Sequence, residues 1–123
     1  MTTRFGFRQI SREANVTPGP MPDAFLDSVL DHFDVGTQRA ILRLYRSAPA
    51  PVLEAAGARL GELRCPALVV WGDQDPYLPP HFADAYAAAL GGDAKVLHLP
   101  GAGHWPWLDE PDLVDRICGF LGE

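Results

Sequence analysis

Residues 65–80, CPALVVWGDQDPYLPP, carry the strongest structural signal in this chain. This stretch begins with a short, continuous apolar run at residues 67–71 that is bounded by a proline and a glycine. A strand that is buried on both faces, as in a parallel sheet, has this pattern. Pro79 and Pro80 then favour the start of a helix, because proline is tolerated in the first helical turn. The stretch therefore predicts a strand, a polar loop and a helix, in that order.

The sequence after this stretch predicts a second strand and a final helix. Residues 95–99, KVLHL, are expected to form the strand, after Gly91 and Gly92 close the preceding helix. The final helix is expected to begin near Pro111, where acidic neighbours suit the positive end of the helix macrodipole. Its predicted apolar face, at helical spacing, comprises Leu113, Val114, Ile117, Phe120 and Leu121. The order strand, helix, strand, helix predicts an α/β unit with two neighbouring parallel strands.

The sequence before residue 62 has a different, all-helical character. Apolar residues at three- and four-residue steps from Asp23 predict a first helix, and residues 38–46 predict a second helix with Thr37 as its N-cap. The side chains expected to face inward on the second helix are Ile41, Leu44 and Tyr45. A stripe of arginines on its other side is expected to be a solvated face: Arg39, Arg43 and Arg46. A third helix is expected at residues 52–60, ended by Gly61 in a left-handed conformation.

The composition limits which partners and which kinds of site are expected. The 123 residues carry 10 Lys and Arg against 16 Asp and Glu, a net charge of −6, which argues against nucleic acid or an anionic membrane as a partner. Cys65 and Cys118 lack metal-ligand spacing and are expected to be buried as small apolar residues. No metal site and no cofactor are expected. Because the sequence shows neither a secretory signal pattern nor a membrane-spanning apolar stretch, a cytoplasmic location is expected.

Two polar loops follow the predicted strands, at the positions where open α/β sheets build their sites. The first loop carries Asp73 and Asp75, and the second carries His104 after two glycines. Parallel neighbouring strands bring such loops side by side, so an aspartate of the first can meet the histidine of the second.

These loops resemble the acid loop and the histidine loop of the α/β-hydrolase fold. The Gly-x-x-Asp core at residues 72–75 resembles the acid loop. The Gly-Ala-Gly-His segment at residues 101–104, with Glu-Pro following at 110–111, resembles the histidine loop and the final helix. The likeness is strong over residues 63–121. The resemblance implies a partial α/β-hydrolase fold, in which a helical cap-like segment, residues 1–62, precedes a C-terminal lobe, residues 63–123, with the last two parallel strands and their helices. The capped members that it resembles are epoxide hydrolases, haloalkane dehalogenases and esterases.

The same resemblance implies roles for residues of the two loops. Asp75 matches the acid of the catalytic triad, and His104 matches the general base that the acid orients. Asp73 is the competing acid, although its offset from Gly72 does not fit the family pattern. The structural alternatives are an Asx turn at Asp75 and a carbonyl-capping role for His104.

Other residues carry weaker hypotheses. Trp105 and Trp107 flank the histidine and could line a substrate pocket or pack in the core. Tyr45, in the cap-like segment, could polarise a substrate oxygen, as cap tyrosines do in epoxide hydrolases. His98 lies among apolar neighbours and is expected to be structural, and His81 and His32 suit helix capping or solvent contact.

The nucleophile of the family is not found in this sequence. It belongs on a Gly-x-Ser-x-Gly or Gly-x-Asp-x-Gly elbow, and neither motif occurs. We therefore expect a chain that is inactive alone and descends from a hydrolase of ester, lactone, epoxide, carbon–halogen or carbon–carbon bonds. Such a chain could be a fragmentary coding sequence, one half of a split enzyme that pairs with a nucleophile-bearing chain, or a self-associated remnant. A small-molecule substrate is expected as its partner only if an N-terminal half completes it. The alternative is a non-catalytic ligand-binding or oligomerisation module.

Overall fold

The computed structural model describes residues 4–16 and 22–122. The front half contains the helices α1 (Arg4–Ala14), α2 (Asp23–His32), α3 (Val35–Ser47) and α4 (Ala50–Gly57), and a 3₁₀ turn (Leu60–Glu62). The back half contains β1 (Ala67–Gly72), α5 (His81–Ala89), β2 (Ala94–Leu99), α6 (Pro106–Asp109) and α7 (Leu113–Leu121). Both predicted strands and the order of the back half are confirmed, whereas the short helix α6 was not predicted.

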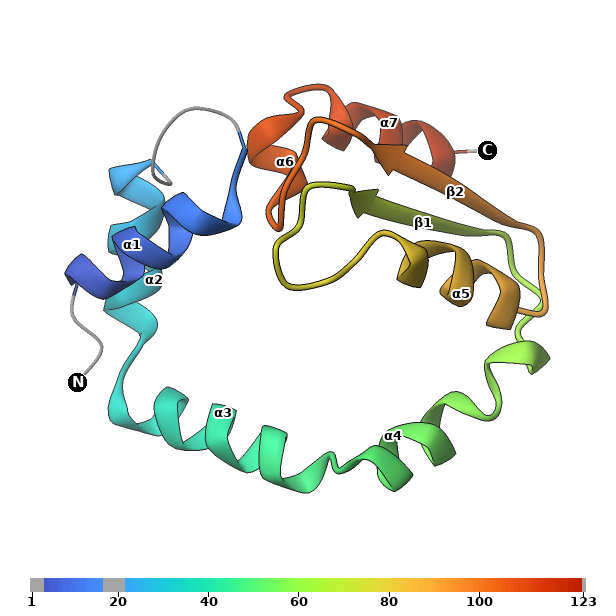
Figure 1. The fold of residues 1–123 in the computed structure, drawn as a ribbon, viewed down its shortest axis with the longest axis horizontal. Coiled ribbons are helices and arrows are strands. Elements are labelled where there is room, and N and C mark those ends of the chain that lie inside the picture. The colour runs from blue at the N-terminus through green and yellow to red at the C-terminus, as the bar shows by residue number, and fades with distance from the viewer. Residues whose placement is uncertain (1–3, 17–21, 123) are drawn as a thin grey trace.

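The two strands form a parallel sheet whose faces are covered by helices. Ala67 of β1 lies opposite Ala94 of β2, and the register runs without a break to Gly72 opposite Leu99. Helix α5 lies along one face of the sheet and α7 lies on the other side (Figure 1). Because a β-α-β connection between adjacent parallel strands brings the carboxyl ends of both strands to one edge, the loops after β1 and β2 lie together there.

The core lies between the sheet and α7. It consists of three buried residues with three half-buried neighbours around them: Leu99, Ala102 and Leu113, with Val70, Leu97 and Ile117. On the other face Trp71 packs against Tyr86 of α5, with ring centroids 6.2 Å apart. Alternate side chains of each strand thus point to opposite faces of the sheet, as the two-residue period of a strand requires.

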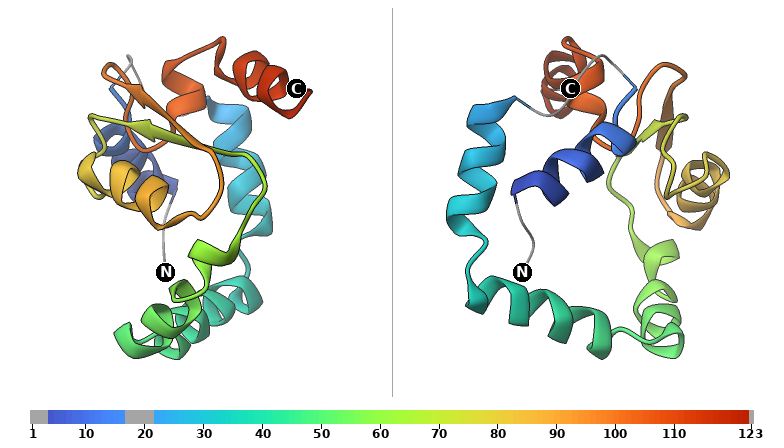
Figure 2. Two further views of the ribbon diagram at one scale, coloured as in Figure 1. Left: turned by 90° about the vertical axis from the view of Figure 1, so that its right-hand side faces the viewer. Right: turned by 60° about the vertical axis from the view of Figure 1, so that its left-hand side comes forward.

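The front helices extend away from the sheet. Helices α1 and α2 pack on each other, and Leu26 of α2 is fully buried. In Figures 1 and 2, α3 and α4 lie at the opposite end of the molecule from the strands, and the 3₁₀ turn leads back to β1. The assignment of residues 1–62 as a cap stays a prediction.

Three details of the front half were predicted wrongly. Helix α3 begins at Val35 rather than after Thr37, because the carboxylate of Asp34 accepts the Thr37 N–H at 2.7 Å and takes the N-cap position. The side chains expected to face inward on α3 are exposed, since no described element covers them: Ile41, Leu44 and Tyr45. Helix α4 ends at Gly57, and Gly61 lies in the 3₁₀ turn without a left-handed backbone.

Both cysteines are exposed rather than buried. Cys65 precedes β1 and therefore lies outside the sheet. On α7 the inward positions belong to Leu113 and Ile117, one helical turn apart, so the next residue, Cys118, faces outward. Across residues 4–16 and 22–122, none of the helices combines the length and apolar character needed to cross a bilayer.

Candidate active site

The loops after β1 and β2 are joined by backbone hydrogen bonds that continue the sheet beyond its last paired residues. The N–H of Asp73 donates to the carbonyl of Leu99 at 3.0 Å, and the N–H of Gln74 donates to the carbonyl of Ala102 at 2.9 Å. A Cβ atom on Gly72 would overlap the carbonyl oxygen of Gly103, so only glycine allows the loops to approach this closely. The acid loop and the histidine loop are therefore held in one arrangement.

Asp75 uses its two carboxylate oxygens for two different purposes. Oδ1 accepts the N–H groups of Tyr77 at 2.8 Å and Leu78 at 3.2 Å, which makes an Asx turn. Oδ2 lies 2.8 Å from Nδ1 of His104. The Asx turn and the pairing with His104, which were alternatives from the sequence, occur together. The turn fixes the carboxylate so that its second oxygen points at the imidazole.

The environment of Asp75 favours its ionised form. Its side chain is only 8% exposed, and this burial by itself raises the pKa of the carboxyl. The hydrogen bond from His104 and those from the backbone N–H groups of Tyr77 and Leu78 outweigh burial, so the pKa of Asp75 lies below its ordinary value. An ionised carboxylate accepts only, so Nδ1 of His104 carries the proton.

His104 is held on several sides. Its backbone N–H donates to the carbonyl of Ala14, at the end of α1, at 2.7 Å. The ring edges meet Tyr77 and Trp105 in T-shaped contacts, with centroids 5.2 and 5.0 Å away. The side chain is 31% exposed, and among the described residues no group bonds to Nε2. With Nδ1 occupied by Asp75, Nε2 is the nitrogen that can accept a proton.

A hollow of about 210 Å³ opens beside the pair. Apolar side chains form most of its wall, and its lining comprises Val70, Trp71, Gly72, Asp75, Leu78, Gly103, His104, Pro106 and Trp107. The structure thus brings His104, Asp75 and Trp107 together. Trp105 contacts His104 and Trp107 but does not line the hollow. Tyr45 lies on α3 with 78% of its surface exposed and takes no part in this site.

A second aspartate–histidine pair lies behind the first, and sequence reasoning missed it. Asp73 Oδ1 lies 2.7 Å from Nδ1 of His98, and Nε2 of His98 lies 3.6 Å from Asp84 of α5. The hydrogen bond with Asp73 is the largest influence on the pKa of His98 and raises it, burial opposes this, and the charge of Asp73 together with the hydrogen bond and charge of Asp84 raises the pKa further. Asp73 is therefore not the acid of His104 in this structure. The available signal was the two-residue period, which puts Trp71 and Asp73 on the same face.

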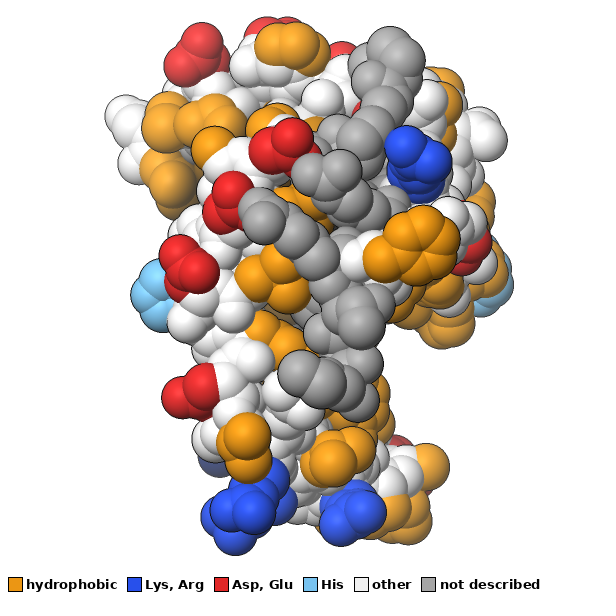
Figure 3. Space-filling view, turned by 90° about the vertical axis from the view of Figure 1, so that its left-hand side faces the viewer, with side chains coloured by type: hydrophobic (Ala, Val, Ile, Leu, Met, Phe, Trp, Pro, Cys, Tyr) orange, Lys and Arg blue, Asp and Glu red, His pale blue; other side chains and the backbone are white. Residues whose placement is uncertain are grey.

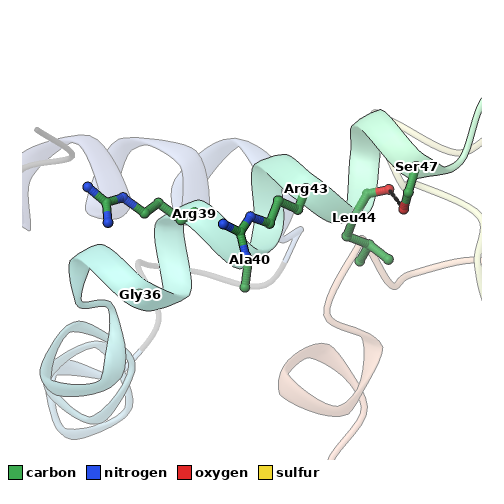
Figure 4. A pocket seen from close by; sticks show the side chains of 6 residues that line it. All are labelled: Gly36, Arg39, Ala40, Arg43, Leu44 and Ser47. Carbon is green, nitrogen blue, oxygen red and sulfur yellow. Dashed lines mark hydrogen bonds between the residues drawn. The ribbon is translucent and has the colours of Figure 1, made fainter.

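A larger hollow, about 570 Å³, lies along α3 (Figure 4). All of its lining residues come from this one helix: Gly36, Arg39, Ala40, Arg43, Leu44 and Ser47. Figure 3 shows Lys and Arg side chains gathered at the lower end of the molecule, where α3 lies. A groove beside a single helix, with exposed arginines, fits the solvated basic face that the sequence predicts. It holds no general base, and we do not assign chemistry to it.

The pair at the strand ends can carry out acid–base chemistry. An imidazole oriented by an ionised carboxylate can take a proton from a hydroxyl or a water molecule and return it to a leaving group. The described residues contain no group of three or more His, Cys, Asp or Glu that could hold a metal ion.

Comparisons with solved structures place this geometry in a known fold. A serine hydrolase involved in carbazole degradation is similar to 99% of this chain with a TM-score of 0.76 and 21% identity, and 48% of that protein is covered. A candidate lipase from Acinetobacter baumannii AYE is similar to 98% of the chain with a TM-score of 0.68 and 19% identity, and 42% of it is covered. The chain thus spans about half the length, or less, of these two structures. At these identities the likeness establishes the fold alone.

A comparison of the sequence with curated proteins found no match. A comparison with models of protein families did find one. Residues 2–117, nearly the whole chain, match the model described as the Alpha/beta hydrolase family. The partial α/β-hydrolase fold predicted from the two loops is confirmed: this chain belongs to the alpha/beta hydrolase family.

Proposed function

We propose that this chain supplies the acid and the general base of an α/β-fold hydrolase, Asp75 and His104. The observation that carries the proposal is the 2.8 Å contact between Asp75 Oδ2 and His104 Nδ1, which leaves Nε2 available at the edge of an apolar hollow. The Asx turn supports it by aiming the second carboxylate oxygen at the imidazole, and the same hydrogen bonds, with that from His104, lower the pKa of Asp75.

The proposed reaction has two steps. In the first, Nε2 accepts the proton of a serine nucleophile as the serine oxygen attacks the substrate, and returns this proton to the leaving group as its bond to the substrate breaks. In the second, Nε2 accepts a proton from the water molecule that attacks the covalent intermediate, and returns it to the serine oxygen as the covalent bond breaks. An aspartate nucleophile needs no deprotonation, so His104 would then act as base only in the second step. The Asp75 carboxylate stabilises the imidazolium that forms in each proton transfer.

The nucleophile and the oxyanion hole are proposed to come from residues outside this sequence. The serines within it are Ser11, Ser28 and Ser47, and none lies in an elbow motif. Ser47 also donates its hydroxyl to the Leu44 carbonyl of its own helix at 2.9 Å. An acid and a base without an activated nucleophile and oriented amide donors give little rate enhancement. We therefore propose that these 123 residues hydrolyse nothing efficiently by themselves and pair with a nucleophile-bearing segment.

Hydrolysis of p-nitrophenyl acetate tests the chain alone. Wild type, His104→Ala and the control His81→Ala, which changes an exposed histidine at the start of α5, should show the same low rate. Turnover that only His104→Ala abolishes would overturn the proposal of inactivity and indicate a nucleophile within the chain.

The DNA upstream of this coding sequence provides the second test. We expect it to encode a strand followed by Gly-x-Ser-x-Gly or Gly-x-Asp-x-Gly, in the same frame or in a neighbouring gene. Serine there would favour ester or carbon–carbon bond hydrolysis, and aspartate would favour epoxide or carbon–halogen chemistry. Co-expression of that segment should give a hydrolase whose kcat falls about 10⁴–10⁶-fold in His104→Ala and stays unchanged in His81→Ala. Equal kcat for both variants would remove His104 from the mechanism.

A non-catalytic binding or oligomerisation module is the second candidate. It is favoured by exposed apolar side chains on α3 and α4, among them Leu44, Val52 and Leu53. This candidate predicts self-association that Leu44→Glu weakens, measured by sedimentation. It also predicts that no upstream elbow segment will be found.

A further inference from the structure

Asp109 lies five residues after His104, yet it bonds back to the peptide that precedes the histidine. Asp109 is the last residue of the four-residue helix α6. Its carboxylate Oδ2 accepts the N–H of Gly103 at 2.8 Å. A hydrogen bond from a backbone N–H to a carboxylate is stronger than one to a neutral carbonyl.

The same region also binds the end of α1. The Val16 N–H points to Oδ2 of Asp109 at 3.4 Å, so this oxygen faces N–H groups from two distant segments. The carbonyl of Ala14 accepts the His104 N–H at 2.7 Å, and Ala14 is buried. A Cβ atom on Gly103 would overlap that carbonyl, so the contact between α1 and the histidine loop is tight.

We infer that Asp109 is a positioning residue that, together with the end of α1, holds His104 in line with Asp75. The N–H groups of Gly103 and His104 are consecutive along the chain, and each has its own fixed acceptor. Fixing both restricts the backbone at the histidine and therefore the direction of its Cα–Cβ bond. The imidazole starts from that bond, and Nδ1 must reach a carboxylate oxygen at 2.8 Å. The inference rests on the proposed role of His104 as base.

This arrangement couples the front helices to the proposed base. The His104 N–H donates to the Ala14 carbonyl, and the Val16 N–H, two residues after Ala14, donates to Asp109. A movement of α1 away from the histidine loop would therefore loosen the pairing of His104 with Asp75. The position of the front segment thus affects the proton-accepting group directly.

The tautomer of His104 measures this positioning without any need for activity. When Asp75 holds the ring, the proton resides on Nδ1, and a released ring can place it on Nε2. The ¹⁵N shifts of the imidazole at pH 8.5 report the ratio of the two tautomers. His98 pairs with Asp73 rather than with Asp75, so its tautomer serves as an internal reference in the same spectrum.

Three variants test the inference. Asp109→Ala removes the acceptor, Asp109→Asn keeps an acceptor oxygen without the charge, and the control Asp115→Asn changes an exposed acid of α7. We expect the Nδ1–H to Nε2–H ratio of His104 to fall in Asp109→Ala by up to about tenfold, which is the factor that transfer of a whole charged hydrogen bond to the ring would give, and to fall less in Asp109→Asn. His98 should be unchanged in all three, and Asp115→Asn should match wild type.

An unchanged tautomer ratio of His104 in Asp109→Ala would overturn the inference. Equal changes of the ratio at His98 and His104 would also overturn it, because they indicate a general loosening of the structure. If circular dichroism shows that Asp109→Ala is unfolded, Asp109→Asn decides by the same comparison of the two histidines. The result is separate from that of the proposed function. Absence of His104-dependent hydrolysis in the completed enzyme would remove the catalytic role, while the tautomer ratios would still show whether Asp109 positions the ring.

Discussion

Asp73 and His98 form a hydrogen-bonded pair, with Oδ1 and Nδ1 2.7 Å apart, directly behind the pair that we propose to be catalytic. Asp73 precedes Asp75 by two residues, so the first pair fixes the start of the loop that carries the second. Asp84 extends the cluster to α5 at 3.6 Å from Nε2 of His98. The pair of Asp73 and His98 therefore links the acid loop to both strands and to the helix between them.

The His98 cluster should make stability depend on pH. The pKa of His98 is raised in the folded chain, chiefly by Asp73, above the value of about 6.5 in an unfolded one. Its contribution is therefore full below about pH 6.5 and is lost as pH rises through the folded pKa. Asp73→Asn should lower the melting temperature more at pH 5.5 than at pH 8.5, and an NMR titration should show a lower pKa for His98. The control is Asp93→Asn, because Asp93 is an exposed acid before β2. A larger loss of melting temperature in Asp73→Asn at pH 8.5 than at pH 5.5 would contradict this account.

Asp75→Asn should separate the two functions of the Asp75 side chain. The amide oxygen can still accept the N–H groups of Tyr77 and Leu78, so the turn should persist and their hydrogen exchange should stay slow. The amide nitrogen can only donate, so the proton of His104 should move from Nδ1 to Nε2, which ¹⁵N NMR detects. Asp73→Asn should leave the His104 tautomer unchanged. Retention of Nδ1–H in Asp75→Asn would argue against the pairing.

Two leucines of α7 provide a matched pair for the core. Leu113 is 1% exposed and packs against Leu99 and Ala102, whereas Leu121 is 76% exposed. Leu113→Ala should lower the free energy of unfolding by about 2–5 kcal/mol, because it leaves a cavity. Leu121→Ala should change it by about 0.5 kcal/mol or less. Urea unfolding of both variants measures the difference, and similar losses would show that α7 does not dock as described.

Two glycines provide a matched pair for the approach of the loops. A Cβ on Gly72 would overlap the Gly103 carbonyl, whereas a Cβ on Gly119 of α7 would meet nothing within 4 Å. Gly72→Ala should destabilise the chain and separate the two loops, seen as faster exchange of the Gln74 N–H. Gly119→Ala should stabilise α7 by about 0.5–1 kcal/mol through helix propensity. Urea unfolding measures both, and a neutral Gly72→Ala would show that the loops can part without cost.

Local patterns accounted for most of the back half. The patterns that predicted it are short: the apolar run of β1, the glycines and prolines at the element ends, and the loop motifs. Each affects the structure only of residues close to it in the sequence. Which apolar side chains of α3 and α7 are buried and which are exposed could not be predicted in this way, because burial depends on which element lies opposite. Leu44 and Leu121 both sit at apolar positions of a helical pattern, and both are exposed.

The sequence by itself determined the two strands, the order of the loops and the residue types, an acid at 75 and an imidazole at 104, that make the site possible. Only the tertiary structure decided which acid meets which histidine. The parallel register puts Trp71 opposite His98, and the two-residue period then places Asp73 beside His98 while the Asx turn carries Asp75 to His104. Register relates segments about 27 residues apart and is specified by which face of each strand is buried, so no local propensity encodes it.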